Sequence, residues 1–343
     1  MRKVLVTGGG GFVGLAVVAR LAAEKVETTV VGRHHYRAAE ALGARCLVGD
    51  IRDPHFMDRA TAGCDTVFHV AAKAGIWGSR NDYFSINVGG TENVISACRK
   101  HGVRSLIHTS TPSVVFDGRS IEGGDESLPY SRKPLCHYAA SKIVAEQKVL
   151  AANGDGLRTV ALRPHLVWGP QDTQIIPRLL ERGRRGTLRM VGGGGNRVDI
   201  SYIDNVAAAH ILAARNLEES GSAAGQPFFI SQGEPVVLWG WINELFDRVG
   251  IPRVRKEISF RTAYRLGWLF EKLFTLLRLE NEPQMTRFLA EQLAESHWFS
   301  IERARLVLAY RPEVPTGEGV DRLVRWLETS VGAEKEQPRS FFS

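Results

Sequence analysis

A glycine-rich segment near the start of the chain has the residue types and spacing of a phosphate-binding loop. Gly8, Gly11 and Gly14 follow a short apolar run and lead into a segment with helical periodicity. Glycine at these places permits a tight turn and close approach of the backbone to a pyrophosphate, whose charge the N-terminus of a helix favours. The loop, which includes Phe12 and Val13, is therefore predicted to bind a dinucleotide.

A tyrosine and a lysine four residues apart supply the second chemical signal. Tyr138 and Lys142 lie in a segment with helical periodicity, where positions i and i+4 share one face. A free phenol has a pKa of about 10 and is a poor proton donor at neutral pH, whereas a neighbouring ammonium group favours the phenolate. The pair is therefore predicted to perform acid–base chemistry.

The first half of the chain, which carries both motifs, alternates short apolar runs with segments of helical periodicity. This alternation predicts a parallel sheet covered by helices on both faces, and right-handed crossovers make it a doubly wound α/β sheet. The ligand crevice of such a sheet lies at the carboxyl ends of the strands. Expected strands cover residues 3–7, 27–31, 45–48, 66–70, 105–109, 159–162 and 228–231, and expected helices cover residues 13–23, 87–100, 138–152, 177–189 and 236–249.

The alternation of apolar runs and helical segments becomes less regular after about residue 170. We interpret this position as the boundary between two regions. Residues 1–170 are predicted to form a dinucleotide-binding Rossmann domain, to which residues of the segment 198–232 return. Residues 171–332 are expected to form a smaller, mostly helical substrate-binding region, and residues 333–343 a flexible tail.

Composition argues against several classes of protein. The 343 residues are 44% hydrophobic and 24% charged, which is typical of soluble globular proteins. Four widely spaced cysteines predict neither a disulfide framework nor a metal site, and a reducing, cytoplasmic compartment is expected. No secretory signal and no run of the ~18–20 apolar residues needed to span a membrane is recognised. The net charge of +7 is interpreted as solvated surface charge, because no nucleic-acid-binding motif accompanies it.

Together the two motifs resemble those of the extended short-chain dehydrogenase/reductases, and the resemblance covers nearly the whole chain. It implies that Tyr138 and Lys142 are catalytic and that Thr111 supplies the catalytic hydroxyl, with Ser110 as the neighbour most easily confused with it. It also implies a structural helix start at residues 87–91. The residues that it places against the cofactor are Asp50 and Ile51 near the adenine, Ala71, Ala72 and Lys73 along its length, and Pro164 and His165 beside the nicotinamide.

Further motifs indicate which group within this family the chain resembles. Residues 163–170 and 199–205 are similar to those of the 3β-hydroxysteroid dehydrogenase-like group. Within that group, residues 72–78, 109–114 and 297–300 are similar to the bacterial 2-alkyl-3-oxoalkanoate reductases of long-chain olefin biosynthesis. The resemblance implies an NAD(P)-dependent oxidoreductase that interconverts a ketone and a secondary alcohol on a hydrophobic substrate, first of all a 2-alkyl-3-oxoalkanoate and its 3-hydroxy acid.

Three alternatives stay open at this point. A 3β-hydroxysteroid or sterol-4-carboxylate 3-dehydrogenase fits the same motifs. A nucleotide-sugar epimerase needs no further residue on this scaffold, whereas a dehydratase of the family has two acidic residues after its threonine, where this chain has Pro112 and Ser113. A dinucleotide sensor without enzymatic activity is disfavoured, since such sensors usually lack the tyrosine.

The end of the second expected strand bears on the choice of cofactor. Enzymes that use NAD commonly place an acidic residue there, which would repel the 2′-phosphate of NADP. Residues 31–37 contain no acidic residue, and Arg33, aided by His34 or Arg37, could bind that phosphate. NADP is therefore the predicted cofactor, with NAD as the alternative if Arg33 only stacks on the adenine.

A basic and aromatic segment at residues 251–280 is the main indication of substrate polarity. It carries seven basic and three acidic residues among many apolar ones, for a net charge of +4. Such a helix could cover a pocket for a lipid-like substrate, touch an anionic membrane, bind a partner or simply pack on the cofactor domain. By the resemblance to the family, the chain is also expected to form a homodimer.

Overall fold

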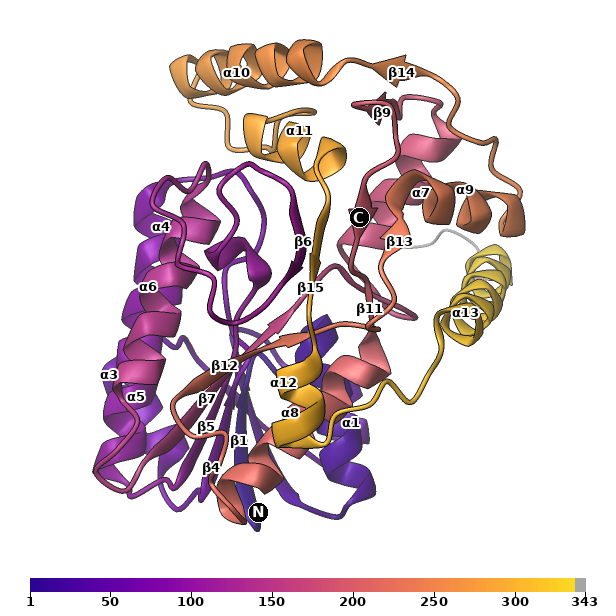
Figure 1. The fold of residues 1–343 in the computed structure, drawn as a ribbon. Coiled ribbons are helices and arrows are strands. Elements are labelled where there is room, and N and C mark those ends of the chain that lie inside the picture. Colours follow the sequence, from indigo (N-terminus) through magenta and orange to yellow (C-terminus); the bar gives the residue numbers. More distant parts are fainter. Residues whose placement is uncertain (337–343) are drawn as a thin grey trace, which may run out of the picture.

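The structure is a computed structural model that describes residues 1–336, and its centre is a seven-stranded parallel sheet (Figure 1). The strand order is β12-β7-β5-β4-β1-β2-β3. The strands are β1 (Lys3–Thr7), β2 (Glu27–Gly32), β3 (Arg45–Val48), β4 (Thr66–His69), β5 (Ser105–Thr109), β7 (Arg158–Pro164) and β12 (Gln226–Ile230). The order reverses between β1 and β4, and the crevice outside their carboxyl ends is the ligand site of such folds. The predicted doubly wound sheet is confirmed.

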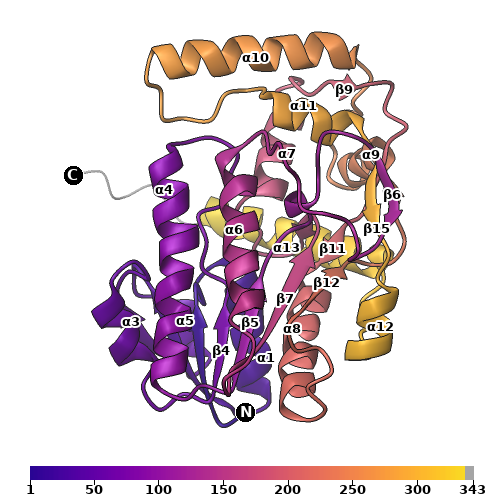
Figure 2. The same ribbon diagram turned by 60° about the vertical axis from the view of Figure 1, so that its left-hand side comes forward.

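Helices cover both faces of the sheet, as Figure 1 and Figure 2 show from two sides. One face carries α1 (Phe12–Ala23), α2 (Arg37–Ala41), α8 (Ile203–Glu218) and α12 (Glu302–Leu308). The other face carries α3 (Pro54–Thr61), α4 (Arg80–Phe84), α5 (Gly90–Lys100) and α6 (His137–Ala151). Strand β1 shows why the strands read as unbroken apolar runs: Val4 and Val6 join the core under α1 and α8, whereas Leu5 joins the core under α3 and α5.

One expected helix begins differently in the structure. The pattern predicts a helix from residue 87, whereas residues Ser85–Gly89 form a single wide π-helical turn and α5 starts at Gly90. The side chain of Asn87 is bonded to the chain at Lys73 and to Ser141 of α6, so this turn is fixed by contacts far away in the sequence. Wide turns of this kind are frequent at functional sites.

The remaining elements form a smaller region above the carboxyl edge of the sheet. The helices are α7 (Ile175–Arg184), α9 (Leu238–Arg248), α10 (Phe260–Leu276), α11 (Arg287–Ala294) and α13 (Thr316–Glu336), together with the short turn η2 (Pro112–Val114). The strands are β6 (Ile121–Gly124), β8 (Val167–Trp168), β9 (Met190–Val191), β10 (Arg197–Val198), β11 (Ser201–Tyr202), β13 (Val236–Val237), β14 (Glu257–Ile258) and β15 (His297–Phe299). Figure 2 shows α10 lying across the top of this region.

The chain crosses between the two regions more than once. After residue 170 it returns to the main sheet as α8 and β12, which pairs with β7 from Gln226 to Ile230. It then passes through the smaller region, where β15 joins a four-stranded sheet of order β13-β10-β15-β6, and returns to the main sheet as α12. Helix α13 continues to Glu336, so the first four residues of the expected tail are helical, and residues 337–343 lie outside the described part. Each helix within residues 1–336 is too short or too polar to span a membrane.

Candidate active site

The glycine loop between β1 and α1 is packed so tightly that Gly8 and Gly14 cannot carry side chains. Gly8 has a φ of +69°, and a Cβ there would lie 2.8 Å from the backbone of Ala71. A Cβ on Gly14 would lie 2.2 Å from the Gly8 carbonyl oxygen. Because Gly11 precedes α1, the backbone N–H groups of Phe12 and Val13 begin the helix and have no carbonyl within it to bond to. The loop therefore fits the pyrophosphate of a dinucleotide.

We expect Gly14→Ala to raise the dissociation constant for NADPH and NADH about tenfold or more. The added methyl group must push the loop away from Gly8, and such overpacking costs about 1–3 kcal/mol. Titration of the protein with each dinucleotide measures the change. Gly317→Ala is the matched control, because no atom lies within 4 Å of a Cβ built there. Equal affinities for the two variants would contradict the assignment of the loop.

Tyr138 and Thr111 lie together at the carboxyl end of β5. Tyr138 lies in the first turn of α6, and Thr111, just beyond β5, lies close to its phenol, with its hydroxyl donating to Ser113 Oγ at 3.2 Å. Burial raises the pKa of Tyr138 to about 12, and the nearby Thr111 hydroxyl opposes this rise. Ser110 points elsewhere and donates to the carboxylate of Glu146. The structure thus places Thr111, rather than Ser110, beside the phenol.

Lys142 lies one helical turn beyond Tyr138 and is 2% exposed. Its Nζ donates to the backbone oxygen of Thr109 at 2.7 Å and to Nε2 of His108 at 3.0 Å. An ammonium group only donates, so Nε2 of His108 accepts and its proton lies on Nδ1. Burial keeps His108 neutral, since its pKa lies well below the usual value. His108 thus holds the lysine in place, a role that the sequence did not reveal.

The charge of Lys142 predicts how the rate depends on pH. Burial lowers the pKa of Lys142 to about 7, so the ammonium form is present below this pH and lost above it. If the ammonium group assists Tyr138, kcat/KM for ketone reduction is highest below pH 7 and falls by up to about tenfold per pH unit above it. Initial rates across this range test the prediction. Lys142→Met should be slow without this decline, and a flat wild-type profile would argue against a titrating lysine.

Asn87 links the cofactor side of the crevice to α6. Its Oδ1 accepts from the backbone N–H of Lys73 at 2.7 Å, and its Nδ2 donates to the Lys73 oxygen and to the hydroxyl of Ser141. Ser141 donates in turn to the backbone oxygen of Tyr138. The side chain of Lys73 is turned to Asp82, with its Nζ at 2.9 Å from a carboxylate oxygen. Asn87 therefore positions the segment of Ala71, Ala72 and Lys73 relative to the tyrosine.

His69 completes a chain of hydrogen bonds between β1, β4 and α5. Thr91 donates to the backbone oxygen of Asn87, so its oxygen accepts from Nε2 of His69, and Nδ1 of His69 accepts from Thr7. Burial lowers the pKa of His69 to about 3. Because both ring nitrogens are used within the core, His69 is a structural residue.

A buried ion pair anchors α6 to the main sheet. Glu146 on α6 and Arg163 on β7 are 0% and 2% exposed, and their closest atoms lie 2.5 Å apart. Tyr130 and Ser110 also donate to the Glu146 carboxylate. Glu146 lies one turn beyond Lys142 and two turns beyond Tyr138, so the pair fixes the face of α6 that carries the chemistry. It went unnoticed in the sequence because its two residues become partners only in the folded chain.

His165 lies at the end of β7, after Pro164, and forms a pair with His297 of β15. The two rings are nearly parallel, and Nδ1 of His297 is 2.8 Å from Nε2 of His165. Nε2 of His297 faces the Gln292 carbonyl oxygen at 2.9 Å and must donate to it, so Nδ1 accepts from His165. Burial lowers the pKa of both rings. His165 is thereby held neutral, with its proton on Nε2.

The end of β2 presents the residues expected near the adenosine. Arg33 is exposed. Asp50 accepts hydrogen bonds from the Arg52 guanidinium, and these are the main reason that the pKa of Asp50 is lowered. Ile51 is 7% exposed and packs under Gly90.

Tyr36, which the sequence did not single out, lies beside two glycines. A Cβ atom on Gly10 would lie 1.9 Å from its ring, and one on Gly32 would lie 2.4 Å from it, so the ring fills the space that these glycines leave.

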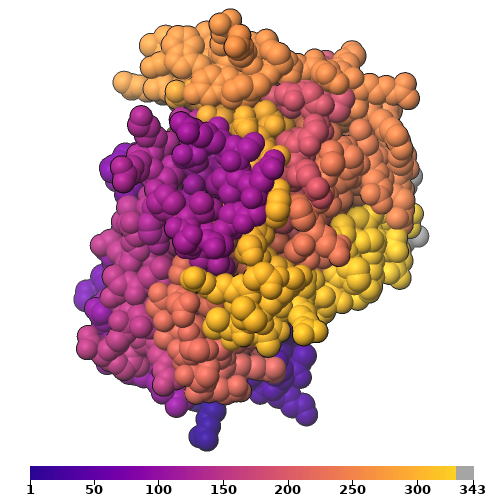
Figure 3. All heavy atoms as spheres, in the orientation of Figure 1, coloured from indigo at the N-terminus to yellow at the C-terminus, as the bar shows by residue number. Residues whose placement is uncertain are grey.

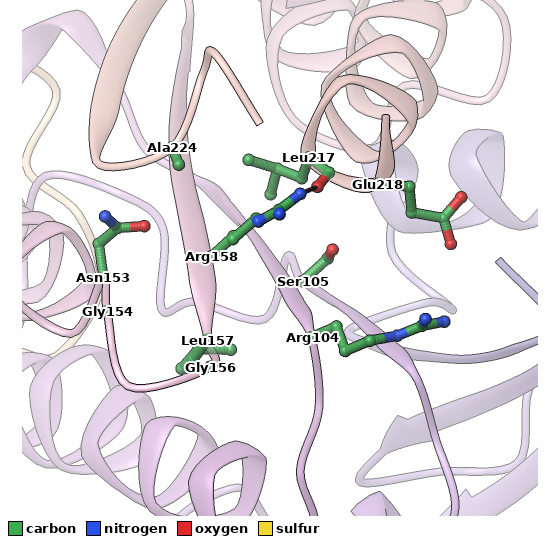
Figure 4. Close-up of a pocket in the computed structure, with 10 residues that line it drawn as sticks. All are labelled: Arg104, Ser105, Asn153, Gly154, Gly156, Leu157, Arg158, Leu217, Glu218 and Ala224. Carbon is green, nitrogen blue, oxygen red and sulfur yellow. Dashed lines mark hydrogen bonds between the residues drawn. The ribbon is translucent and has the colours of Figure 1, made fainter. Parts of the chain in front are cut away.

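A pocket elsewhere in the structure is unrelated to this chemistry. Figure 4 shows it at the amino ends of β5 and β7, lined by Ser105, Arg158 and Leu217, among others. Arg158 donates there to the backbone oxygen of Leu217. Thr111 and His165 lie beyond the carboxyl ends of the same two strands, at the opposite edge of the sheet. Within residues 1–336, no cluster of His, Cys, Asp or Glu could hold a metal ion.

The fold, the glycine loop and the Thr111, Tyr138 and Lys142 group define a short-chain dehydrogenase/reductase. Residues 5–261 match the model of the 3-beta hydroxysteroid dehydrogenase/isomerase family. The chain belongs to this family and is an oxidoreductase.

The chain is similar to relatives with two different enzyme activities. The chain is 50% identical to the 2-alkyl-3-oxoalkanoate reductase of Stenotrophomonas maltophilia (strain K279a), over 94% of this chain and 98% of that protein. It is 32% identical to the mouse (Mus musculus) sterol-4-alpha-carboxylate 3-dehydrogenase, decarboxylating, over 94% of this chain and 90% of that protein. Among solved structures, a dTDP-glucose 4,6-dehydratase from Streptomyces venezuelae with NAD bound is 25% identical, with a TM-score of 0.75, over 97% of this chain and 98% of that chain.

Proposed function

We propose that the protein reduces a 2-alkyl-3-oxoalkanoate to the 3-hydroxy acid with a nicotinamide dinucleotide. The observation that carries the proposal is the group formed by Thr111, Tyr138 and Lys142 at the carboxyl edge of β5, beside a glycine loop that fits a pyrophosphate. The 50% identity to a 2-alkyl-3-oxoalkanoate reductase over nearly the whole chain supports the choice of substrate.

The roles of the residues follow from their geometry. The bound nicotinamide supplies the hydride. Tyr138, protonated at neutral pH, donates its proton to the oxygen of the ketone as negative charge develops there. Thr111, which lies beside the phenol, hydrogen-bonds the same oxygen. Lys142 presents positive charge from the next turn of α6, held by His108 and the Thr109 carbonyl. His165 borders the expected position of the nicotinamide. Its ring is neutral, with the proton on Nε2.

A sterol-4-carboxylate 3-dehydrogenase is the second candidate, favoured by the 32% identity to the mouse enzyme. Both relatives' names describe a carboxylate close to the carbon that is oxidised or reduced. The test gives purified protein a 2-alkyl-3-oxoalkanoate with NADPH or NADH, and separately a sterol 4-carboxylate with NADP or NAD. Turnover of the keto acid alone supports the proposal. Turnover of the sterol alone would replace it, and conversion of a sugar nucleotide without added cofactor would indicate an epimerase.

NADP is the proposed cofactor, because Arg33 is the exposed cation at the end of β2 and residues 31–37 contain no carboxylate. We expect Arg33→Asp to lower the ratio of kcat/KM for NADPH to that for NADH about tenfold or more, since the new carboxylate repels the 2′-phosphate. Arg59→Asp makes the same change of charge at an exposed position on α3 and is the control. A ratio unchanged by Arg33→Asp would remove the argument for NADP.

The homodimer and the cytoplasmic location stay predictions. Sedimentation of the purified protein measures the first. Neither affects the proposed chemistry, because each residue used above belongs to one chain.

A further inference from the structure

Helix α10 and the turn that follows it carry most of the exposed large apolar side chains of the described chain. Of eleven such residues, seven lie between residues 266 and 279. They are Leu266, Trp268, Leu269, Leu273, Leu276, Leu277 and Leu279. Four of them, Leu266, Leu269, Leu273 and Leu276, recur at intervals of three and four residues and so form one stripe along the helix. We call these seven residues the α10 apolar face. Scattered exposed leucines need no explanation, but a contiguous patch marks an interaction surface.

The orientation of α10 is fixed by its inner side, so the exposure of this face is a property of the fold. Gly267 packs so closely on α11 that a Cβ there would lie 2.5 Å from the backbone of Thr286. Glu271 forms an ion pair with Arg287 of α11 at 2.7 Å. Ser259 caps the first turn by accepting from the N–H of Thr262. Rotation of the helix to bury its leucines would break the contacts of Gly267 and Glu271 with α11.

Exposed cations accompany the apolar face. Arg261, Arg265 and Lys272 lie along α10 beside the leucine stripe, and Arg278 follows the helix. Within residues 1–336, none of these four side chains has an acidic partner among the ion pairs. The acidic residue inside the helix, Glu271, is turned inward to Arg287. The outer surface therefore combines apolar and positively charged side chains, which is the composition of helices that lie at anionic lipid surfaces.

The position of α10 connects this surface with the crevice. Figure 3 shows residues 260–280 as the layer that caps one end of the molecule. Trp77 donates from Nε1 to the Leu279 oxygen at 3.1 Å, and its ring meets that of Phe274 edge to face at 6.1 Å. Trp77 lies in the segment that follows β4, four residues beyond Lys73. The α10 apolar face thus adjoins the loop that borders the active site.

We propose that the α10 apolar face binds the surface of an anionic lipid bilayer. The charge of the face is complementary to acidic headgroups, whereas a second copy docked on it would bring like charges together. Leucine and tryptophan side chains would enter the region between headgroups and acyl chains, while the cations remain at the headgroups. This contact holds the Trp77 loop, and with it the mouth of the crevice, at the membrane.

Flotation with vesicles tests this proposal. The wild-type protein should float with vesicles in which a third of the lipid is phosphatidylglycerol and the rest phosphatidylcholine. It should float much less with phosphatidylcholine alone, and raised salt should weaken the binding. The double variant Leu269→Glu/Leu276→Glu should bind about tenfold or more weakly, because it places charges where the acyl chains would be. Arg265→Gln/Lys272→Gln should lose the preference for the anionic lipid.

Leu306→Glu is the matched control, since Leu306 is 83% exposed but lies on α12. Each variant should keep the dinucleotide affinity of the wild type, which shows that it is folded. Wild-type protein that fails to float with either vesicle, or that floats equally well after Leu269→Glu/Leu276→Glu, would overturn the proposal. Lipid-free dimerisation abolished by that double variant, without vesicle binding by the wild type, would assign the face to a second copy instead.

Discussion

Tyr138→Phe should lower kcat for ketone reduction about 10²–10⁴-fold, the range for loss of a positioned proton donor. The change removes one oxygen atom and keeps the ring between α6 and β5. The developing alkoxide then has the Thr111 hydroxyl but no group to protonate it. Because the glycine loop, Asn87 and Lys142 are untouched, dinucleotide binding should change less than about twofold. Steady-state kinetics and dinucleotide titration on the same preparation separate the two effects.

Tyr83→Phe is the control for this experiment. The Tyr83 ring lies 6.5 Å from that of Tyr138, and its hydroxyl donates to the backbone oxygens of Ala74 and Trp77. Its loss removes hydrogen bonds to a loop without removing a proton donor, so a much smaller drop in kcat is expected. If Tyr138→Phe kept more than about a tenth of the wild-type kcat, another group would have to supply the proton.

Arg163→Met should lower the free energy of unfolding by about 3–5 kcal/mol, because it leaves Glu146 buried without its counter-charge. The carboxylate would keep its hydrogen bonds from Ser110 and Tyr130, but these groups carry no charge. Denaturant or thermal unfolding measures the effect. Loss of this ion pair would also disturb the active site, since Glu146 shares a face of α6 with Lys142 and Tyr138.

Two further variants identify the cause of this loss. Glu146→Leu/Arg163→Met removes both charges and should recover a substantial part of the stability, as apolar replacements of buried pairs often do. Arg215→Met removes one partner of the exposed Arg215–Glu24 pair and should cost less than about 1 kcal/mol. A loss under about 1 kcal/mol for Arg163→Met, equal to that of Arg215→Met, would show that the pair does not anchor α6.

The parts of the fold that could be predicted are those with local signals. Each strand of the main sheet is four to seven residues long and is centred on apolar or β-branched residues, and the glycine loop and Tyr138–Lys142 spacing lie within single short segments. By contrast, β6 and β15 are four and three residues long and pair across about 175 positions, from Ile121 to His297. No periodicity develops over so few residues, so the sequence predicted neither β6 nor β15.

The candidate site also divides into residues with a local signal in the sequence and residues placed by distant contacts. The sequence supplied Thr111 and Ser110 as neighbours, but only the position of Glu146, which accepts from Ser110, separates their roles. His165 and His297 become partners across 132 positions, and His108 meets Lys142 across 34. Tyr36 is recognisable only through the space that two glycines leave for its ring. Contacts between distant residues decide which side chains support the chemistry, and a single sequence carries no local signal for them.

The central claim is that the chain transfers a hydride from a nicotinamide to the C3 carbonyl of a 2-alkyl-3-oxoalkanoate. The most direct measurement gives the purified protein this substrate with NADPH that carries deuterium at both C4 positions of the nicotinamide, and analyses the product by mass spectrometry. We expect a 3-hydroxy acid with one deuterium at C3, formed by the wild type and not, within the same time, by Tyr138→Phe. A hydroxy acid without deuterium, or unreacted ketone with both labelled NADPH and labelled NADH, would contradict the claim.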